Sequence, residues 1–159
     1  MSKECHDKTT GEYDGPPGAG KTTYVKKSMS YGDIIVDMDA FYYAVSGLDW
    51  YKKPECLLPF VCEARYTIIN RLSKPSNKNS AWVIRSGAKK KEREKLQEEL
   101  GAQVIVIEKS LHECINPISK DEFRSNFEVW EKLLRRWWEE YEKSEGDVVV
   151  SSGISIDVY

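Results

Sequence analysis

Eight residues near the N-terminus, Gly15 to Thr22, carry the strongest chemical signal in the sequence. They read GPPGAGKT and match the phosphate-binding loop G-x-x-x-x-G-K-[ST] at every required position. Glycines let the backbone fold so tightly that its N–H groups point into a concavity that holds phosphate oxygens. A helix that begins near Lys21 would add the positive end of its dipole. The pattern therefore predicts a nucleotide site, with ATP as its cofactor.

The polar residues of this loop have distinct expected roles. Lys21 should reach the β- and γ-phosphates of ATP and take part in catalysis, while the Thr22 hydroxyl should hold Mg²⁺. Thr23 is adjacent, and the motif requires no role of it. The residues expected to bind the cofactor are Gly15, Pro16, Pro17, Gly18, Ala19, Gly20, Lys21, Thr22 and Thr23.

Two acids supply the next candidate chemistry. Asp37 and Asp39 close the apolar run at 33–39, which is typical of a buried parallel strand, and their spacing predicts that they share one face. Acids at the C-terminal end of a parallel strand face the ligand crevice. One would accept a proton from a substrate hydroxyl, and the other would help to hold Mg²⁺. The alternative interpretation is a pair of solvated acids at a strand end.

The elements that would position these residues alternate along the chain. Periodicity predicts strands at 33–39, 81–87 and 103–109 and helices at 22–28, 57–72 and 89–100. The alternation favours an α/β fold, a three-layer P-loop NTPase-like domain with a mainly parallel central sheet. We assign residues 1–143 to this domain and 144–159 to a β-prone C-terminal tail that could complete the sheet.

Two capping-box signals predict helix starts in the C-terminal half of the chain. Ser110 with Glu113 is the first, and Pro117 is expected to cut that helix short. Ser119 with Glu122 is the second. The helix that follows carries an apolar face, which we interpret as core or partner packing, made by Phe123, Phe127, Trp130, Leu133, Leu134, Trp137, Trp138 and Tyr141.

The segment before the phosphate-binding loop is unusually polar. A loop of this kind normally follows an apolar strand, but the preceding residues ECHDKTTGEYD offer only Tyr13 close to the loop. Either a short polar strand lies within Lys8 to Asp14, or the tail from Val148 fills that position in the sheet. The sequence leaves both alternatives open.

Composition limits the function classes and the setting. The chain has 159 residues, a formal net charge of −2 and 31% charged residues, so no global basic field argues for nucleic acid. No apolar run approaches the ~20 residues that would span a membrane, and the polar N-terminus lacks a signal-peptide core. We therefore expect no membrane partner and a cytoplasmic location.

Three stretches together resemble phage-type P-loop kinases related to polynucleotide 5′-hydroxyl kinases. They are GPPGAGKTTYV, DMDAFYYA and WVIRSGAKKKEREKLQEELGAQVIVIEKS, and the resemblance covers roughly residues 15–116. In that family an aspartate just after the second strand is the general base toward the 5′-hydroxyl, and the matching residue here is Asp39. The resemblance also implies a host cytoplasm as the location if the chain is of phage origin.

The arginines expected in such kinases are placed differently here. Where the family often has an arginine that binds substrate phosphate, three residues past the base, this chain has Tyr42. The helix beginning near Leu111 lacks a lid arginine before its proline, so Arg124 is the nearest substitute, followed further on by Arg135 and Arg136. Arg85, at the end of the strand in VIRSG, is a second candidate for substrate phosphate, with a surface arginine as the alternative.

These observations favour an ATP-binding kinase that transfers the γ-phosphate to a hydroxyl acceptor such as a nucleoside or a polynucleotide 5′-end. The partners would then be a nucleotide and a nucleoside or nucleic-acid acceptor. An ATPase or nucleotide-dependent switch is the alternative, with Trp130, Trp137 and Trp138 as a partner-docking face. A non-catalytic scaffold that keeps the loop is a third interpretation. The oligomeric state stays open.

Overall fold

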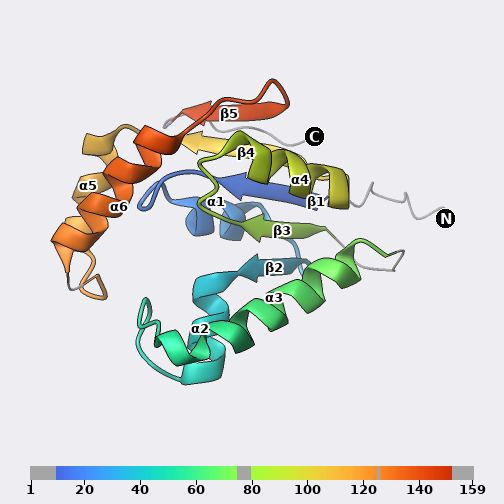
Figure 1. The fold of residues 1–159 in the computed structure, drawn as a ribbon, viewed down its shortest axis with the longest axis horizontal. Helices are drawn as coiled ribbons and strands as arrows, with labels where there is room; N and C mark the ends of the chain where they lie inside the picture. The colour runs from blue at the N-terminus through green and yellow to red at the C-terminus, as the bar shows by residue number, and fades with distance from the viewer. Residues whose placement is uncertain (1–9, 75–79, 125, 152–159) are drawn as a thin grey trace.

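The computed structural model describes residues 10–74, 80–124 and 126–151. Within these ranges the strands form one five-stranded parallel sheet in the order β2-β3-β1-β4-β5 (Figure 1). The strands are β1 (Thr10–Asp14), β2 (Ile34–Asp37), β3 (Ala81–Ile84), β4 (Gln103–Glu108) and β5 (Asp147–Ser151). The predicted α/β fold with a mainly parallel sheet is therefore confirmed.

The polar segment before the phosphate-binding loop takes the central position of the sheet. β1 pairs with β3 on one side and with β4 on the other, so its backbone groups are satisfied along both edges. Its neighbours supply the apolar surface, since all four residues of β3 are buried. β5 pairs with β4 at the edge instead, which excludes it from the central position. Residues 152–159 of the predicted tail lie outside the described residues.

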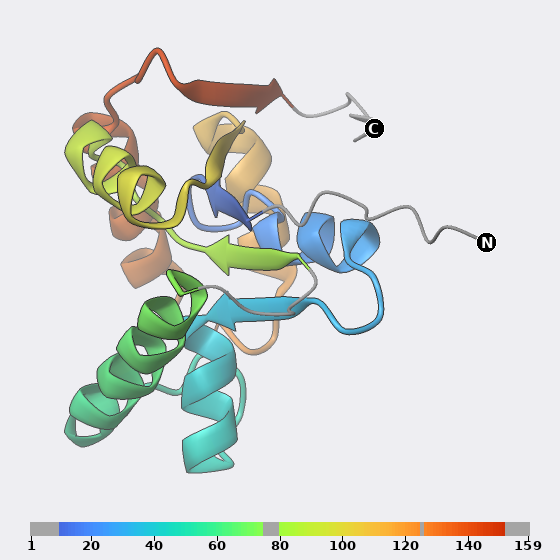
Figure 2. The same ribbon diagram turned by 90° about the vertical axis from the view of Figure 1, so that its right-hand side faces the viewer.

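Helices cover both faces of this sheet (Figure 2). On one face α1 (Lys21–Ser28) and α5 (Leu111–Lys120) pack against strand side chains in a core cluster that includes Val25, Ile84, Ile107 and Ile118. On the other face α3 (Leu58–Leu72), preceded by the short η1 (Glu55–Leu57), and α4 (Lys90–Leu100) bury Val36, Ile69, Val83 and Leu96. Three layers result, because alternate strand residues point to opposite faces.

The helices of the C-terminal half begin and end differently from the prediction. The capping box at Ser110 is present, but α5 continues through Pro117 to Lys120. The apolar contacts of Cys114 and Ile118, both buried, hold the helix across the proline. Ser119 therefore lies inside α5, and the second predicted start is wrong. The last helix, α6 (Phe127–Glu140), begins instead behind Asn126, whose side chain accepts a hydrogen bond from the backbone N–H of Val129 at 3.4 Å.

The sequence prediction also missed one helix, α2 (Met38–Ser46). Gly47 ends it with a positive φ of 64°. The loop from residue 47 to residue 54 then leads to η1 and α3. Among the described residues, none of the helices is long and apolar enough to cross a membrane.

Candidate active site

The phosphate-binding loop is folded tightly between β1 and α1, beside the end of β4 and α5. Gly18 has a φ of 79°, and a Cβ atom there would lie 2.8 Å from the carbonyl oxygen of Cys114. A Cβ atom at Gly15 would lie 2.6 Å from the carbonyl oxygen of Ile107. Gly15 has a φ of 150°, so both positions need glycine for the backbone angle as well as for space. These contacts keep the loop in the concave shape that the motif predicts.

Lys21 lies over this loop with its ammonium bonded to the loop's own backbone. Its Nζ donates to the carbonyl oxygens of Gly15, at 2.7 Å, and Pro16, at 2.9 Å. Burial lowers the pKa of Lys21 to about 8, and the carboxylate of Asp14 opposes that shift. The cation therefore lacks a full set of strong anionic partners, which a polyphosphate would supply.

Thr22 and Asp37 meet at the end of β2. The Thr22 hydroxyl lies 3.3 Å from Asp37 Oδ2, while Asp37 Oδ1 accepts a hydrogen bond from the backbone N–H of Asp39 at 3.0 Å. Burial raises the pKa of Asp37, and the nearby Asp39 adds to the rise. A hydroxyl and a carboxylate are oxygen ligands of the kind that Mg²⁺ prefers, and a cation would relieve the raised pKa. The donor set thus fits the predicted magnesium.

Asp39 does not lie on the strand, contrary to the prediction that the two acids share a strand face. The strand ends at Asp37, which is the N-cap of α2, and Asp39 is in the first turn of that helix. The geometry is nevertheless close to the expected one, because both acids line the same cavity. Asp39 forms an ion pair with Lys53 from the loop between α2 and η1. Lys53 was not a sequence candidate, since it belongs to no motif.

A cavity of about 800 Å³ joins these groups at the C-terminal ends of the strands. Of the predicted nucleotide-binding residues, Gly18, Gly20, Lys21, Thr22 and Thr23 line it. Gly15, Pro16 and Ala19 are buried residues of the same loop, and Pro17 lines a neighbouring groove. The part of the cavity wall formed by α2 and α3 adds Tyr42, Leu58, Cys62 and Arg65. Of these four, sequence analysis had named only Tyr42, at the position where the resembling kinases often have an arginine.

The predicted arginines separate into two groups. Arg85 and Arg124 both line the cavity. Arg85 also contacts Glu92, whose carbonyl oxygen lies 3.2 Å from Arg85 Nη1. By contrast, Arg135 and Arg136 make ion pairs along the exposed surface of α6 and do not line this cavity. Arg124 is therefore the better match for the expected lid arginine.

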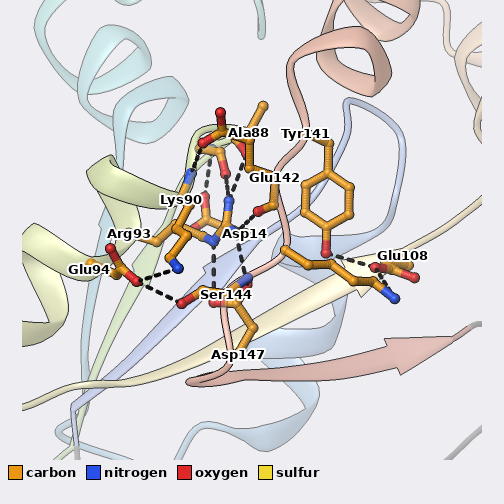
Figure 3. Close-up of polar contacts among 12 residues, drawn as sticks. Asp14, Ala88, Lys90, Arg93, Glu94, Glu108, Tyr141, Glu142, Ser144 and Asp147 are labelled. Carbon is orange, nitrogen blue, oxygen red and sulfur yellow. Dashed lines mark hydrogen bonds and ion pairs between the residues drawn. The ribbon is translucent and has the colours of Figure 1, made fainter.

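A buried polar network joins Asp14 at the end of β1 to Arg93 of α4 and Asp147 of β5 (Figure 3). The Asp14 carboxylate accepts a hydrogen bond from the backbone N–H of Gly87 at 2.6 Å. Arg93 donates to the carbonyl oxygens of Gly87 and Ala88, both at 2.8 Å, and pairs with Asp147 at 2.7 Å. Arg93 lies within the charged run KKKEREK at 89–95, yet its side chain is fully buried.

Comparison with solved structures identifies the fold to which this site belongs. A gluconokinase from Sinorhizobium meliloti 1021 superposes with a TM-score of 0.58 at 17% identity, over 93% of this chain and 84% of that one. The tunicamycin resistance protein of Deinococcus radiodurans gives 0.56 at 14% identity, over 93% and 88%. Shikimate kinase from Acinetobacter baumannii, in complex with shikimate, gives 0.53 at 19% identity, over 94% and 86%.

Sequence comparison adds nothing to these structural similarities. No protein-family model and no curated protein sequence matches the chain. The fold is therefore shared with kinases whose sequences differ in more than four positions out of five. The chain therefore shares the parallel α/β fold of these structures, and its GPPGAGKT loop lies at the cavity where the parallel strands end.

Proposed function

We propose that the protein is an ATP-dependent kinase that transfers the γ-phosphate to a hydroxyl group of an acceptor bound in the 800 Å³ cavity. The observation that carries this proposal is the convergence on one cavity of the phosphate-binding loop, Arg124 and the two acids at the end of β2 and the start of α2. The kinase fold supports it. An ATPase alone would need no acceptor space, whereas α2, α3 and the segment after β3 line the cavity beside the loop and would form such a space.

The residues present fit ATP with Mg²⁺. The loop backbone and Lys21 would hold the phosphates, and Thr22 with Asp37 would hold the metal. Bound ATP and Mg²⁺ would supply the phosphoryl group and neutralise part of its charge. Binding of the polyphosphate would give the Lys21 ammonium the anionic partners that it lacks.

The chain's own residues would activate the acceptor. Asp39 would take the proton of the acceptor hydroxyl. The hydroxyl oxygen would bond to the γ-phosphorus as the bond between that phosphorus and the β–γ bridging oxygen of ATP breaks. To take the proton, the Asp39 carboxylate must share or leave the contact with Lys53. Arg124 and Lys21 would stabilise the negative charge on the phosphoryl group in the transition state of its transfer. Arg85 would bind an anionic group of the acceptor.

The acceptor that we propose is a nucleoside or a polynucleotide 5′-end, as the sequence resemblance implies. The names of two structural neighbours offer gluconate and shikimate as further hydroxyl compounds for the same test. A panel of γ-labelled ATP transfers should therefore contain nucleosides, 5′-hydroxyl oligonucleotides, gluconate and shikimate.

The test compares wild type with Asp39→Asn in that panel. We expect the substitution to lower transfer to the active acceptor by about 10²–10⁴-fold with nucleotide affinity retained, because general-base catalysis is lost while the phosphate-binding loop is intact. Asp49→Asn is the matched control, since Asp49 is an exposed acid of the neighbouring loop and does not line the cavity. Equal transfer by wild type and Asp39→Asn would show that Asp39 is not the base. ATP hydrolysis that no acceptor changes would favour the ATPase instead.

A further inference from the structure

Arg124 is held in a corner between two aromatic rings. Its Cζ atom lies 4.5 Å from the ring centroid of Tyr51 and 4.5 Å from that of Trp130. The two rings are themselves in contact, with centroids 5.2 Å apart and planes at 70°. The three residues come from different segments: the loop after α2, the loop between α5 and α6, and α6 itself. We call this group the arginine clamp.

Part of the Arg124 guanidinium has no hydrogen-bond acceptor among the described residues. Nη2 donates to the hydroxyl of Tyr51 at 2.7 Å, and Nε lies 3.2 Å from Asp121 Oδ2. Nη1 is buried and has no hydrogen-bond partner among the described residues. A buried charged donor without an acceptor is costly, and a phosphate oxygen is the acceptor that a guanidinium suits best. Arg124 and Lys21 line the same cavity, so the phosphates of a bound nucleotide would supply the acceptor oxygen for Nη1.

The backbone conformation of Tyr51 indicates that its contact with Arg124 and Trp130 is specific. Tyr51 has a φ of 69°, the left-handed region that residues with a Cβ atom avoid, and it is the one non-glycine residue with positive φ in the described part of the chain. Such a conformation persists only where surrounding contacts hold it. Here the contacts are the ring of Trp130 and the guanidinium of Arg124, together with Trp50, whose ring centroid lies 6.3 Å away.

The same loop reaches the proposed base. Lys53, two residues after Tyr51, makes the ion pair with Asp39. The loop between α2 and η1 therefore contacts the charged groups on both sides of the space for the transferred phosphate: Arg124 through Tyr51, and Asp39 through Lys53. A loop that only closed the surface would have no reason to carry both contacts.

We propose that Tyr51 and Trp130 are positioning residues that direct Nη1 of Arg124 to the γ-phosphate of the bound nucleotide, a role that rests on the proposed kinase function. The rings fix the plane of the guanidinium, and the Tyr51 hydroxyl fixes its rotation through Nη2. Arg124 then needs no reorganisation when the phosphoryl group moves, which is the condition for strong electrostatic stabilisation. The clamp thus takes the place of a lid arginine on the helix after β4.

The experiment measures steady-state kinetics with the acceptor of the panel that is phosphorylated fastest. If the protein phosphorylates none of them, the rate of ATP hydrolysis is measured instead. Trp130→Ala should lower kcat by about ten- to hundredfold while the KM for ATP changes less than threefold, because orientation and not binding is lost. Trp130→Phe keeps a ring at the position and should restore most of kcat. Tyr51→Phe should lower kcat by only a few fold, since it removes the hydroxyl alone.

A double-mutant cycle separates the clamp from a general packing effect. If Trp130 acts through Arg124, Arg124→Ala with Trp130→Ala should be no slower than Arg124→Ala alone. Phe127→Ala is the matched control, because Phe127 is an aromatic residue of α6 that lines neither cavity. Additive losses, or an equal loss in Phe127→Ala, would overturn the proposal.

A binding measurement keeps this test independent of turnover. Binding is measured by calorimetry with ADP and with the non-hydrolysable analogue AMP-PNP. Arg124→Ala and Trp130→Ala should each weaken the binding of AMP-PNP more than the binding of ADP, because only AMP-PNP carries a γ-phosphate. That result in a protein without transfer activity would support the clamp and refute the proposed function. An unchanged AMP-PNP to ADP ratio in Trp130→Ala, with a changed ratio in Arg124→Ala, would overturn the clamp. A folded wild type that binds neither nucleotide would refute both.

Discussion

The nucleotide affinity of the protein should fall as pH rises from 7.5 to 9, and the cause is Lys21. Burial lowers the pKa of its ammonium to about 8 in the free protein. A bound polyphosphate would stabilise the ammonium and return the pKa to its ordinary value near 10.4. Above pH 8, binding must therefore take up a proton, and that uptake becomes less favourable as the pH rises.

The size of the effect follows from the two pKa values. With a free pKa of about 8, roughly a quarter of the Lys21 side chains are neutral at pH 7.5 and roughly nine-tenths at pH 9. The dissociation constant should consequently rise about eightfold, equivalent to about 1.2 kcal/mol, between these pH values. At pH 8 binding should take up about half a proton for each nucleotide. Burial raises the pKa of the Cys114 thiol to about 11, so this neighbour stays protonated throughout.

Titration calorimetry with ADP, in pairs of buffers with different ionisation enthalpies, measures both the affinity and the proton uptake. Lys21→Ala is the control, and it should bind weakly with no pH dependence over this range. A dissociation constant that changes less than twofold in wild type, with no proton uptake at pH 8, would refute the reasoning. The same pKa predicts that the stability of the free protein rises between pH 8 and 10.5, because there the unfolded chain binds the extra proton.

Two further substitutions test the loop and the buried network. Gly18→Ala should lower the free energy of unfolding by about 1–3 kcal/mol and weaken ATP binding, because its Cβ atom would lie 2.8 Å from a carbonyl oxygen. Gly101→Ala, also at positive φ but with open space around it, should leave ATP binding unchanged in the same calorimetric assay. Arg93→Met should cost about 3–5 kcal/mol in urea unfolding, because it leaves Asp147 buried without its cation. Arg136→Met, on an exposed ion pair, should leave the unfolding midpoint unchanged, and equal losses in both arginine variants would contradict this account.

Much of the fold could be predicted because local signals and tertiary structure agree in several elements. The end of α4 at Gly101 and the start of α5 at Ser110 follow from residues whose capping chemistry acts within one turn. The phosphate-binding loop is likewise local, since its glycines and Lys21 act within eight residues. Where a signal depended on distant contacts, prediction failed. Pro117 reads as a helix end, yet buried side chains on either side keep α5 helical.

The site was predictable only in its motif-bearing half. The acids after β2 follow from the rule that strand ends face the crevice. Tyr51 and Lys53 do not, because their roles arise from contacts across the cavity with Arg124 and Asp39, and no spacing in the sequence encodes those contacts. Arg93 shows the same limit: it lies in a run of charged residues, and only the three-dimensional structure reveals that it alone of that run is fully buried.

The polar strand before the loop has a physical explanation in this buried network. Asp14 ends β1, and its carboxylate binds the backbone N–H of Gly87 on the segment that carries Arg85 to the cavity. A Cβ atom at Gly87 would lie 2.8 Å from that carboxylate, so a larger residue there would displace the Asp14 side chain from this contact. The charge of Asp14 is offset by Arg93 and by Lys21. An apolar residue at Asp14 would leave the Gly87 N–H without this acceptor and would remove the acid that most strongly opposes the lowered pKa of Lys21. The polar residue at the end of β1 therefore connects the phosphate-binding loop to the segment after β3 that lines the cavity.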